Sequence, residues 1–230
     1  LIDAILEVYS SMYNPDAIQY RREKGLLNLS EQMGILIQEV VGHRVGEYYM
    51  PDFSGVAFSH NNLRWSARIK REDGLVRMVM GLGTRAVDRV NDDYPILFSV
   101  GHPELPVNQT PADIRHYSPK YIDLINLEKN RLETVNTPTF LKEVGEQLPG
   151  LHRYVSVFND DFIESKNAFS LDTQNDEMVI TFNKILTATD IPARLKRTLE
   201  VLSEKMGTPV DIEFAYDGKR LYLLQCRPHG

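Results

Sequence analysis

The chain has 230 residues, of which 42% are hydrophobic and 25% are charged, proportions that are ordinary for a globular protein with one large or two small cores. Its formal charge of −6 argues against nucleic acid or an anionic membrane as the main partner. The single cysteine, Cys226, excludes an internal disulfide and a thiolate metal cluster, and it favours a reducing, cytoplasmic location.

The first forty residues predict two helices followed by a strand. Apolar residues recur at helical spacing over 2–12, and Asn14-Pro15 ends this run and begins a second helix that stops near Gly25. Residues 35–41 are apolar on both faces and rich in β-branched side chains, which predicts a buried strand. Because the chain begins in helical pattern without Met, we expect it to be a piece of a larger protein.

The next segment predicts strands separated by tight turns. Three runs have strand character: 56–59, 67–71 and 75–80. Gly81-Leu82-Gly83 follows the last of them and could open a helix, an arrangement that can bind phosphate through backbone N–H groups. Two glycines after a strand are more often only a turn, and the sequence favours that simpler interpretation.

Residues 103–175 have the weakest pattern. Three prolines between 103 and 111 predict a loop, and short helices are expected over 121–129 and 140–147. Strands are expected over 155–158 and 178–182. We therefore divide the chain into an N-terminal part (1–102), a divergent insert or linker (103–175) and a C-terminal part (176–230).

The C-terminal part has the clearest signals. Residues 191–206 predict a helix, with Asp190 at its N-cap, Pro192 in its first turn and Gly207 after its end. Two strand-like runs follow, 210–216 and 220–228, and Asp217-Gly218-Lys219 between them predicts a tight hairpin turn.

Polar residues interrupt this apolar hairpin. Side chains two apart share one face of a strand, so Gln225 and Arg227 point the same way, as do Asp211 and Glu213. An acid and an amide supply oxygen ligands for Mg²⁺, which is usually shared with nucleotide phosphates, and an Arg beside them offers a fork to phosphate oxygens. The alternative is an ordinary solvent-facing hairpin.

This segment resembles the end of the ATP-grasp domain of the phosphoenolpyruvate synthase and pyruvate phosphate dikinase family. That family carries a Glu, then a Gln twelve positions on, then an Arg two further, and Glu213, Gln225 and Arg227 have this spacing. The similarity continues upstream and is weakest between about 103 and 170. The upstream segments that resemble the family are 17–22, 35–41, 54–59 and 81–83.

The resemblance implies a mixed α/β (α+β), ATP-grasp-like fold with a mixed sheet and flanking helices. The fragment would be incomplete, because the family also uses a Lys and an Arg-Ser-Ser stretch upstream of the matched region. We expect the chain alone to bind ATP weakly or not at all, and to show no turnover. Glu213 and Gln225 would hold Mg²⁺, and Arg227 would be catalytic. The implied ATP-binding residues are Gln38, Glu39 and Val40 on the adenine side, and Glu213, Gln225 and Arg227 on the phosphate side.

The implied reaction uses Mg·ATP to phosphorylate a carrier histidine on another domain, with AMP as product, and passes the phosphoryl group to pyruvate in a barrel domain. Two alternatives remain open. One is an ATP-grasp unit with another acceptor, of the glucan-water dikinase or rifampin phosphotransferase type. The other is a non-catalytic regulatory relative.

One position departs from the family pattern. The family commonly has Glu after Gly-Leu-Gly, where this chain has Thr84, so no metal-binding role is assigned there. Arg85 and Arg89 follow, and pairing with Asp88, Asp92 and Asp93 is expected in preference to phosphate contact.

Overall fold

The computed structural model describes residues 2–30, 32–87 and 93–229, which form two compact units divided between Val40 and Val41. The first unit contains α1 (Ile2–Ser11) and α2 (Pro15–Glu23), which are the two predicted helices. Neither helix buries a side chain, and Ile2 and Leu6 on α1 are 74% and 59% exposed. The unit is therefore held by local helical hydrogen bonds more than by a core of its own.

The predicted buried strand over 35–41 is wrong. Residues 32–42 form neither helix nor strand, and Leu36 and Ile37 are 76% and 63% exposed. A strand is stabilised by ladder hydrogen bonds and by the burial of its faces. None of the described strands pairs with this segment, so most of its apolar side chains stay exposed.

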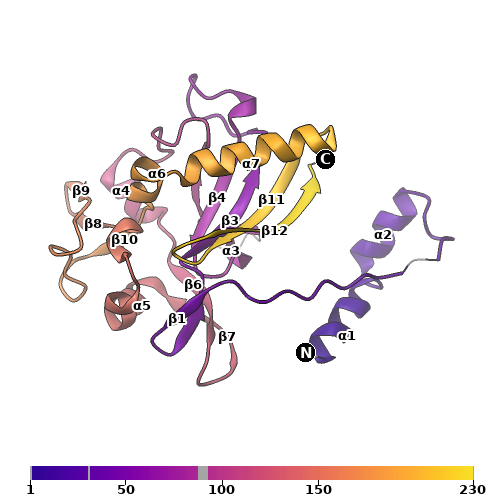
Figure 1. Ribbon diagram of the computed structural model, residues 1–230, viewed down its shortest axis with the longest axis horizontal. Coiled ribbons are helices and arrows are strands. Elements are labelled where there is room, and N and C mark those ends of the chain that lie inside the picture. The colour runs from indigo at the N-terminus through magenta and orange to yellow at the C-terminus, as the bar shows by residue number, and fades with distance from the viewer. Residues whose placement is uncertain (1, 31, 88–92, 230) are drawn as a thin grey trace. The chain divides into compact units, whose positions relative to one another are not determined.

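The second unit is built on a five-stranded sheet with the order β12-β11-β3-β4-β5. Every pair in this sheet is antiparallel. Figure 1 shows α7 (Ile191–Met206) lying across one face of the sheet. The strands are β3 (Phe53–Phe58), β4 (Leu75–Met80), β5 (Ile96–Phe98), β11 (Val210–Tyr216) and β12 (Leu221–Pro228).

The two faces of this sheet differ in character. The inner face contributes Phe53, Met78 and Phe214 to a core that also includes Leu195 and Leu199 of α7. Alternate residues point to the opposite, outer face. The outer face has only a small apolar cluster, in which Val56 and Val79 pack with Ala86 of α3 (Thr84–Val87).

Two smaller antiparallel sheets and several short helices complete the unit. One sheet has the order β1-β2-β6-β7 and the other has the order β10-β8-β9. The strands are β1 (His43–Val45), β2 (Tyr48–Met50), β6 (Tyr121–Asn126), β7 (Arg131–Asn136), β8 (Val155–Asn159), β9 (Phe162–Glu164) and β10 (Met178–Ile180). The helices are α4 (Pro111–His116), α5 (Thr137–Val144) and α6 (Asn183–Ala188), with 3₁₀ turns η1 (Arg71–Asp73), η2 (Gly145–Gln147) and η3 (Leu151–Arg153).

These elements confirm the predicted α+β class but correct three details of the fold predicted from the sequence. The described strands form three antiparallel sheets instead of one mixed sheet, and the sole parallel pairing among them is an isolated bridge between Gly81 and Asp123. The predicted helix over 121–129 is wrong, because Ile122, Leu124 and Asn126 are buried with the period of two that a strand requires. The predicted strand over 67–71 is also wrong, because that segment ends in η1.

One core joins all three predicted parts of the chain. Phe53, Phe140 and Phe214, one from each part, belong to the same buried cluster. Residues 103–175 therefore pack as part of the second unit, and the boundaries near 102 and 175 stay a prediction about which segments correspond to the family.

The core can be tested at Phe214, which is 1% exposed. Phe214→Ala leaves a cavity between the sheet and its neighbours and should lower the free energy of unfolding by about 3–5 kcal/mol in a urea titration. Phe169→Ala is the matched control, because Phe169 is 100% exposed and its loss should cost less than about 0.5 kcal/mol. Equal effects of the two substitutions would contradict this core.

Candidate functional site

The predicted hairpin is present, and its register brings the predicted phosphate-side residues together. Glu213 on β11 lies opposite Gln225 on β12, and Asp211 lies opposite Arg227. Residues directly opposite each other on antiparallel strands project from the same face. A bulge follows Glu213. The one-residue shift of the ladder therefore begins after these two pairs and does not affect them. Four polar side chains therefore share the outer face of the sheet.

Beyond Glu213 the row crosses an apolar residue of β3 and ends at a basic residue of β4. Glu213 lies opposite Val56, and Val56 lies opposite Arg77, which extends the row from Gln225 to β4. The Arg77 guanidinium lies 5.4 Å from the ring centroid of Phe58. Phe58 itself lies opposite Asp211. Because the described residues offer Arg77 no carboxylate partner, its charge is available to a ligand on this face.

Arg227 is held in place by a buried acid. Its Nε lies 2.7 Å from Oδ1 of Asp211, a residue that is only 6% exposed. The other oxygen of Asp211, Oδ2, lies 3.7 Å from Nδ1 of His229. A carboxylate bound at Nε leaves the two terminal nitrogens of the guanidinium free. Asp211 therefore orients Arg227 without using its whole hydrogen-bonding fork.

Glu213 and Gln225 have the chemistry of a shared magnesium site. Glu213 is half-buried, and its carboxylate has no hydrogen-bond or ion-pair partner among the described residues. Gln225, directly opposite, is exposed and adds an amide oxygen. The described part of the chain has no cluster of three or more His, Cys, Asp or Glu side chains suited to a metal. Two oxygen ligands fit an ion that takes its other ligands from water and phosphate.

The Gly-Leu-Gly segment forms the expected turn and opens the short helix α3. Gly81 has a φ of 77°, and the N–H of Leu82 donates to the Asp123 carbonyl on β6 at 2.8 Å. The Thr84 hydroxyl donates to the Asp123 side chain. The position where the family commonly carries Glu is thus used here in a contact between α3 and β6.

Arg85 pairs with acids, as predicted. Its Nη1 lies 3.0 Å from Asp93, and its Nε lies 3.1 Å from Asp123, which the sequence had not indicated as a partner. Arg89 and its expected partners Asp88 and Asp92 lie outside the described residues. Arg85 is therefore committed to structure and does not reach toward the hairpin as a free cation.

The pKa of Asp123 reflects these contacts. Partial burial raises it, but hydrogen bonds from Thr134, Thr84 and Arg85 outweigh burial and hold the pKa below its usual value. A carboxyl with a lowered pKa stabilises the folded state above the unfolded-state pKa, and this stabilisation is lost as the pH falls through the folded-state pKa. The link between β6 and α3 is therefore sensitive to acid.

We expect Asp123→Asn to lower the free energy of unfolding at neutral pH. The difference between wild type and variant should narrow as the pH falls below about 4, where the carboxyl of the unfolded wild type is protonated, until the pH has passed the lower folded-state pKa. Denaturant titrations over a pH series measure this difference. Asp160→Asn, at an exposed turn, should show neither effect. A difference that stays constant over the whole pH range would contradict the role given to the Asp123 charge.

Gln38, Glu39 and Val40, the predicted adenine-side residues, belong to the first unit. All three are exposed and lie in the segment without regular structure that was predicted to be a strand. The structure describes the two units separately, so the adenine-side role stays a prediction.

The sequence did not assign roles to Arg77, Asp211 and His229 on the polar face. Asp211 precedes Glu213 by two residues, so its position on the same face was predictable. Arg77 reaches this face through the pairing of β3 with both β4 and β11, which no local pattern indicates.

Residues 1–230 match the protein family described as Pyruvate phosphate dikinase, AMP/ATP-binding domain. The chain therefore belongs to this family, and its resemblance to the phosphoenolpyruvate synthase and pyruvate phosphate dikinase group is confirmed. The general function of this family is ATP/AMP binding in kinase-like phosphotransferases. A comparison with curated protein sequences gives no match. None of the described helices has the length and apolar character needed to span a membrane.

Proposed function

We propose that the chain is the nucleotide-binding part of a phosphoenolpyruvate synthase-like or pyruvate phosphate dikinase-like enzyme with an ATP-grasp fold. The enzyme would use Mg·ATP to phosphorylate a carrier histidine on another domain, with AMP as product. The observation that carries this proposal is the shared face of Glu213, Gln225 and Arg227 on the hairpin. These are the three residues whose spacing matches the family.

Within this proposal, Glu213 and Gln225 bind Mg²⁺, which supplies positive charge to the ATP phosphates. Phosphoryl transfer depends mainly on positioning and charge stabilisation. Arg227, oriented by Asp211, donates its free N–H groups to the transferred group as negative charge develops there. Asp211 acts through Arg227 and is a positioning residue.

Arg77 adds a further cation to the same face. The cross-strand row from Arg77 through Val56 to Glu213 and Gln225 spans four neighbouring strands. Adjacent strands lie about 4.8 Å apart, so β4 lies roughly 14 Å from β12 across the sheet. We assign Arg77 to the phosphates at the end of the row away from β12.

The proposed enzyme also needs an adenine-binding side and two further domains, which the residues of the sheet face do not supply. Gln38, Glu39 and Val40 would line the adenine through backbone groups. The carrier-histidine domain and the pyruvate-binding barrel would be other domains of the parent protein, in the cytoplasm. A second candidate is a non-catalytic regulatory relative, which is favoured by one observation: Thr84 is engaged with Asp123 where the family commonly has Glu.

Phosphorus NMR of the intact parent protein with Mg²⁺, ATP and pyruvate tests the reaction. Wild type should form AMP and phosphoenolpyruvate, and Glu213→Ala should lower the rate on the order of 10²-fold or more. Glu164→Ala, an exposed acid on β9, should leave the rate unchanged. ATP untouched by the wild type would support the regulatory relative. AMP without phosphoenolpyruvate would indicate another acceptor.

Arg77 gives a separate prediction about affinity. Arg77→Met should weaken ATP binding to the intact protein about tenfold or more but leave adenosine binding nearly unchanged, because only ATP carries the phosphates that the guanidinium contacts. Isothermal titration calorimetry measures both affinities. Arg68→Met is the control, since Arg68 is exposed and pairs with Glu104. An equal loss of ATP and adenosine affinity would show that Arg77 does not contact phosphate.

A further inference from the structure

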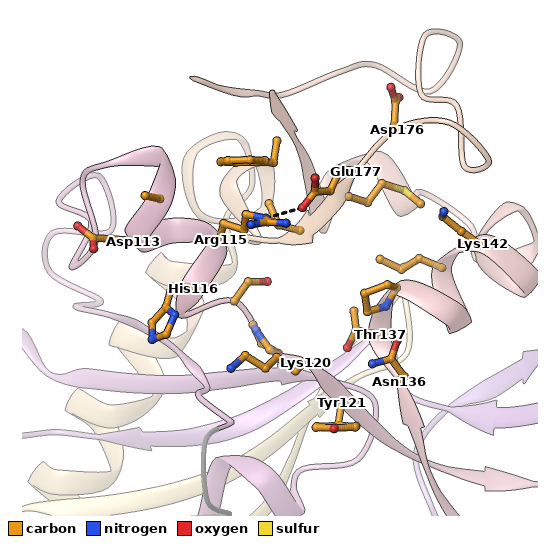
Figure 2. A pocket seen from close by; sticks show the side chains of 18 of the residues that line it. Asp113, Arg115, His116, Lys120, Tyr121, Asn136, Thr137, Lys142, Asp176 and Glu177 are labelled. Atoms are coloured by element: carbon orange, nitrogen blue, oxygen red, sulfur yellow. Dashed lines mark hydrogen bonds and ion pairs between the residues drawn. The ribbon is translucent and has the colours of Figure 1, made fainter. Parts of the chain in front are cut away.

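A pocket of about 980 Å³ lies away from the polar sheet face, between α4 and α5. We call it the α4–α5 pocket, and its wall is completed by residues 118–121 and by the segment that leads into β10. Figure 2 shows His116 on one side, Lys120 and Tyr121 at the lower side, and Asn136 and Thr137 opposite His116. None of the residues proposed to bind the nucleotide lines this pocket.

The acidic residues around the pocket are already engaged. Glu177 forms an ion pair with Arg115, as the dashed line in Figure 2 shows. Asp176 lies 2.7 Å from the Lys166 ammonium. Asp113 accepts a hydrogen bond from the Thr110 hydroxyl in the N-terminal cap of α4. Glu177 and Asp176 are therefore neutralised by other residues of the chain, and Asp113 is engaged in the helix cap.

Two lysines of the wall, unlike Arg115, have no ion-pair partner among the described residues. Lys120 is half-buried, and its ammonium has no ion pair or hydrogen bond with any of the described residues. Lys142, on the opposite side in Figure 2, is likewise without an acidic partner in the described part of the chain. Two lysines thus line one hollow without an acidic partner among the described residues, although the whole protein carries a net charge of −6.

A buried hydroxyl in the same wall also lacks a partner. Thr137 is 2% exposed, and its Oγ1 has no hydrogen-bond partner among the described residues. Its backbone N–H donates to the Lys120 carbonyl at 2.8 Å, which places Thr137 directly beside Lys120. A buried polar group without a partner is unfavourable, and a ligand acceptor would remove that cost.

The remaining wall is mainly apolar. Leu141, Met178 and Phe158 line the pocket. The Arg115 guanidinium carbon lies 5.0 Å from the centroid of the Phe158 ring. Binding pockets for small molecules commonly combine such an apolar wall with a few placed polar groups. A purely inorganic ion would leave this apolar surface uncovered.

We propose that the α4–α5 pocket binds a small organic anion, a carboxylate or phosphate joined to an apolar group. Lys120 supplies the main charge, Lys142 adds to it from the opposite side, and the Thr137 hydroxyl donates a hydrogen bond. The site is separate from the sheet face, so it does not depend on the proposed phosphotransfer reaction.

Two-dimensional NMR of the whole 230-residue chain tests the site with three probes of similar size. Phenyl phosphate and benzoate carry the anionic groups, and benzyl alcohol is neutral. At millimolar concentrations at least one anion should shift the amide signals of residues 115–121 and 136–142, and it should bind more tightly than benzyl alcohol. Tighter phenyl phosphate binding would identify a phosphate ligand, and tighter benzoate binding a carboxylate.

Substitutions then assign the contacts. Lys120→Met should weaken the affinity for the anion about tenfold, whereas Lys205→Met, at the exposed end of α7, should not change it. Thr137→Val should weaken anion binding without lowering the unfolding temperature, because the hydroxyl has no partner to lose in the free protein. Thr137→Val keeps the test valid if Lys120→Met fails to fold.

Three results would overturn the proposal. They are equal binding of benzyl alcohol and the anions, equal loss in Lys120→Met and Lys205→Met, and shifts confined to residues outside the pocket. None of these results bears on ATP binding, so failure here is distinguishable from failure of the proposed reaction.

Discussion

The antiparallel register of β11 with β3 and β12 is the constraint on which the candidate site depends. Slipping β11 by one residue would exchange its faces, burying Glu213 and exposing Phe214. The register is held by the core, because Ile212, Phe214 and Tyr216 are buried on the inner face. It is also held at one end of the strand, where the N–H of Ser59 donates to the Val210 carbonyl at 2.9 Å. The polar outer face therefore exists because the inner face is apolar.

The hairpin turn is fixed by a second, buried polar contact. Asp52 is 0% exposed and accepts a hydrogen bond from the Tyr154 hydroxyl, and its backbone N–H donates to the Tyr216 carbonyl at 2.8 Å. Burial raises the pKa of both Asp52 and Tyr154. A Cβ on Gly218 would approach Asp52 Oδ2 to 2.7 Å, and the φ of 89° also favours glycine there. The Asp-Gly turn thus closes over a carboxyl that joins it to the rest of the unit.

Charge is distributed unevenly over the molecule. On the sheet face, Asp211 fixes Arg227, while Glu213 and Arg77 have no ion-pair partner among the described residues. Beside α3, by contrast, Arg85 is balanced by Asp93 and Asp123. A chain whose net charge is −6 repels anions on average, so anionic ligands require local cations such as those on the sheet face and in the α4–α5 pocket. The position of the free charges, more than their number, indicates where ligands bind.

The sequence by itself determined the elements whose signals are local. Helix α7 has its proline and glycine at the expected ends, and the β11–β12 hairpin has its Asp-Gly turn, so both elements were predicted, the hairpin together with its family-matching residues. The tertiary structure alone decided what depends on partners distant in the chain. Residues 35–41 looked like a buried strand, but burial requires a neighbouring strand that the described residues do not provide. Arg77 joins the polar face only because β3 pairs with both β4 and β11. Periodicity and turn residues report on a segment's own backbone, whereas strand pairing and burial are properties of the assembled sheet.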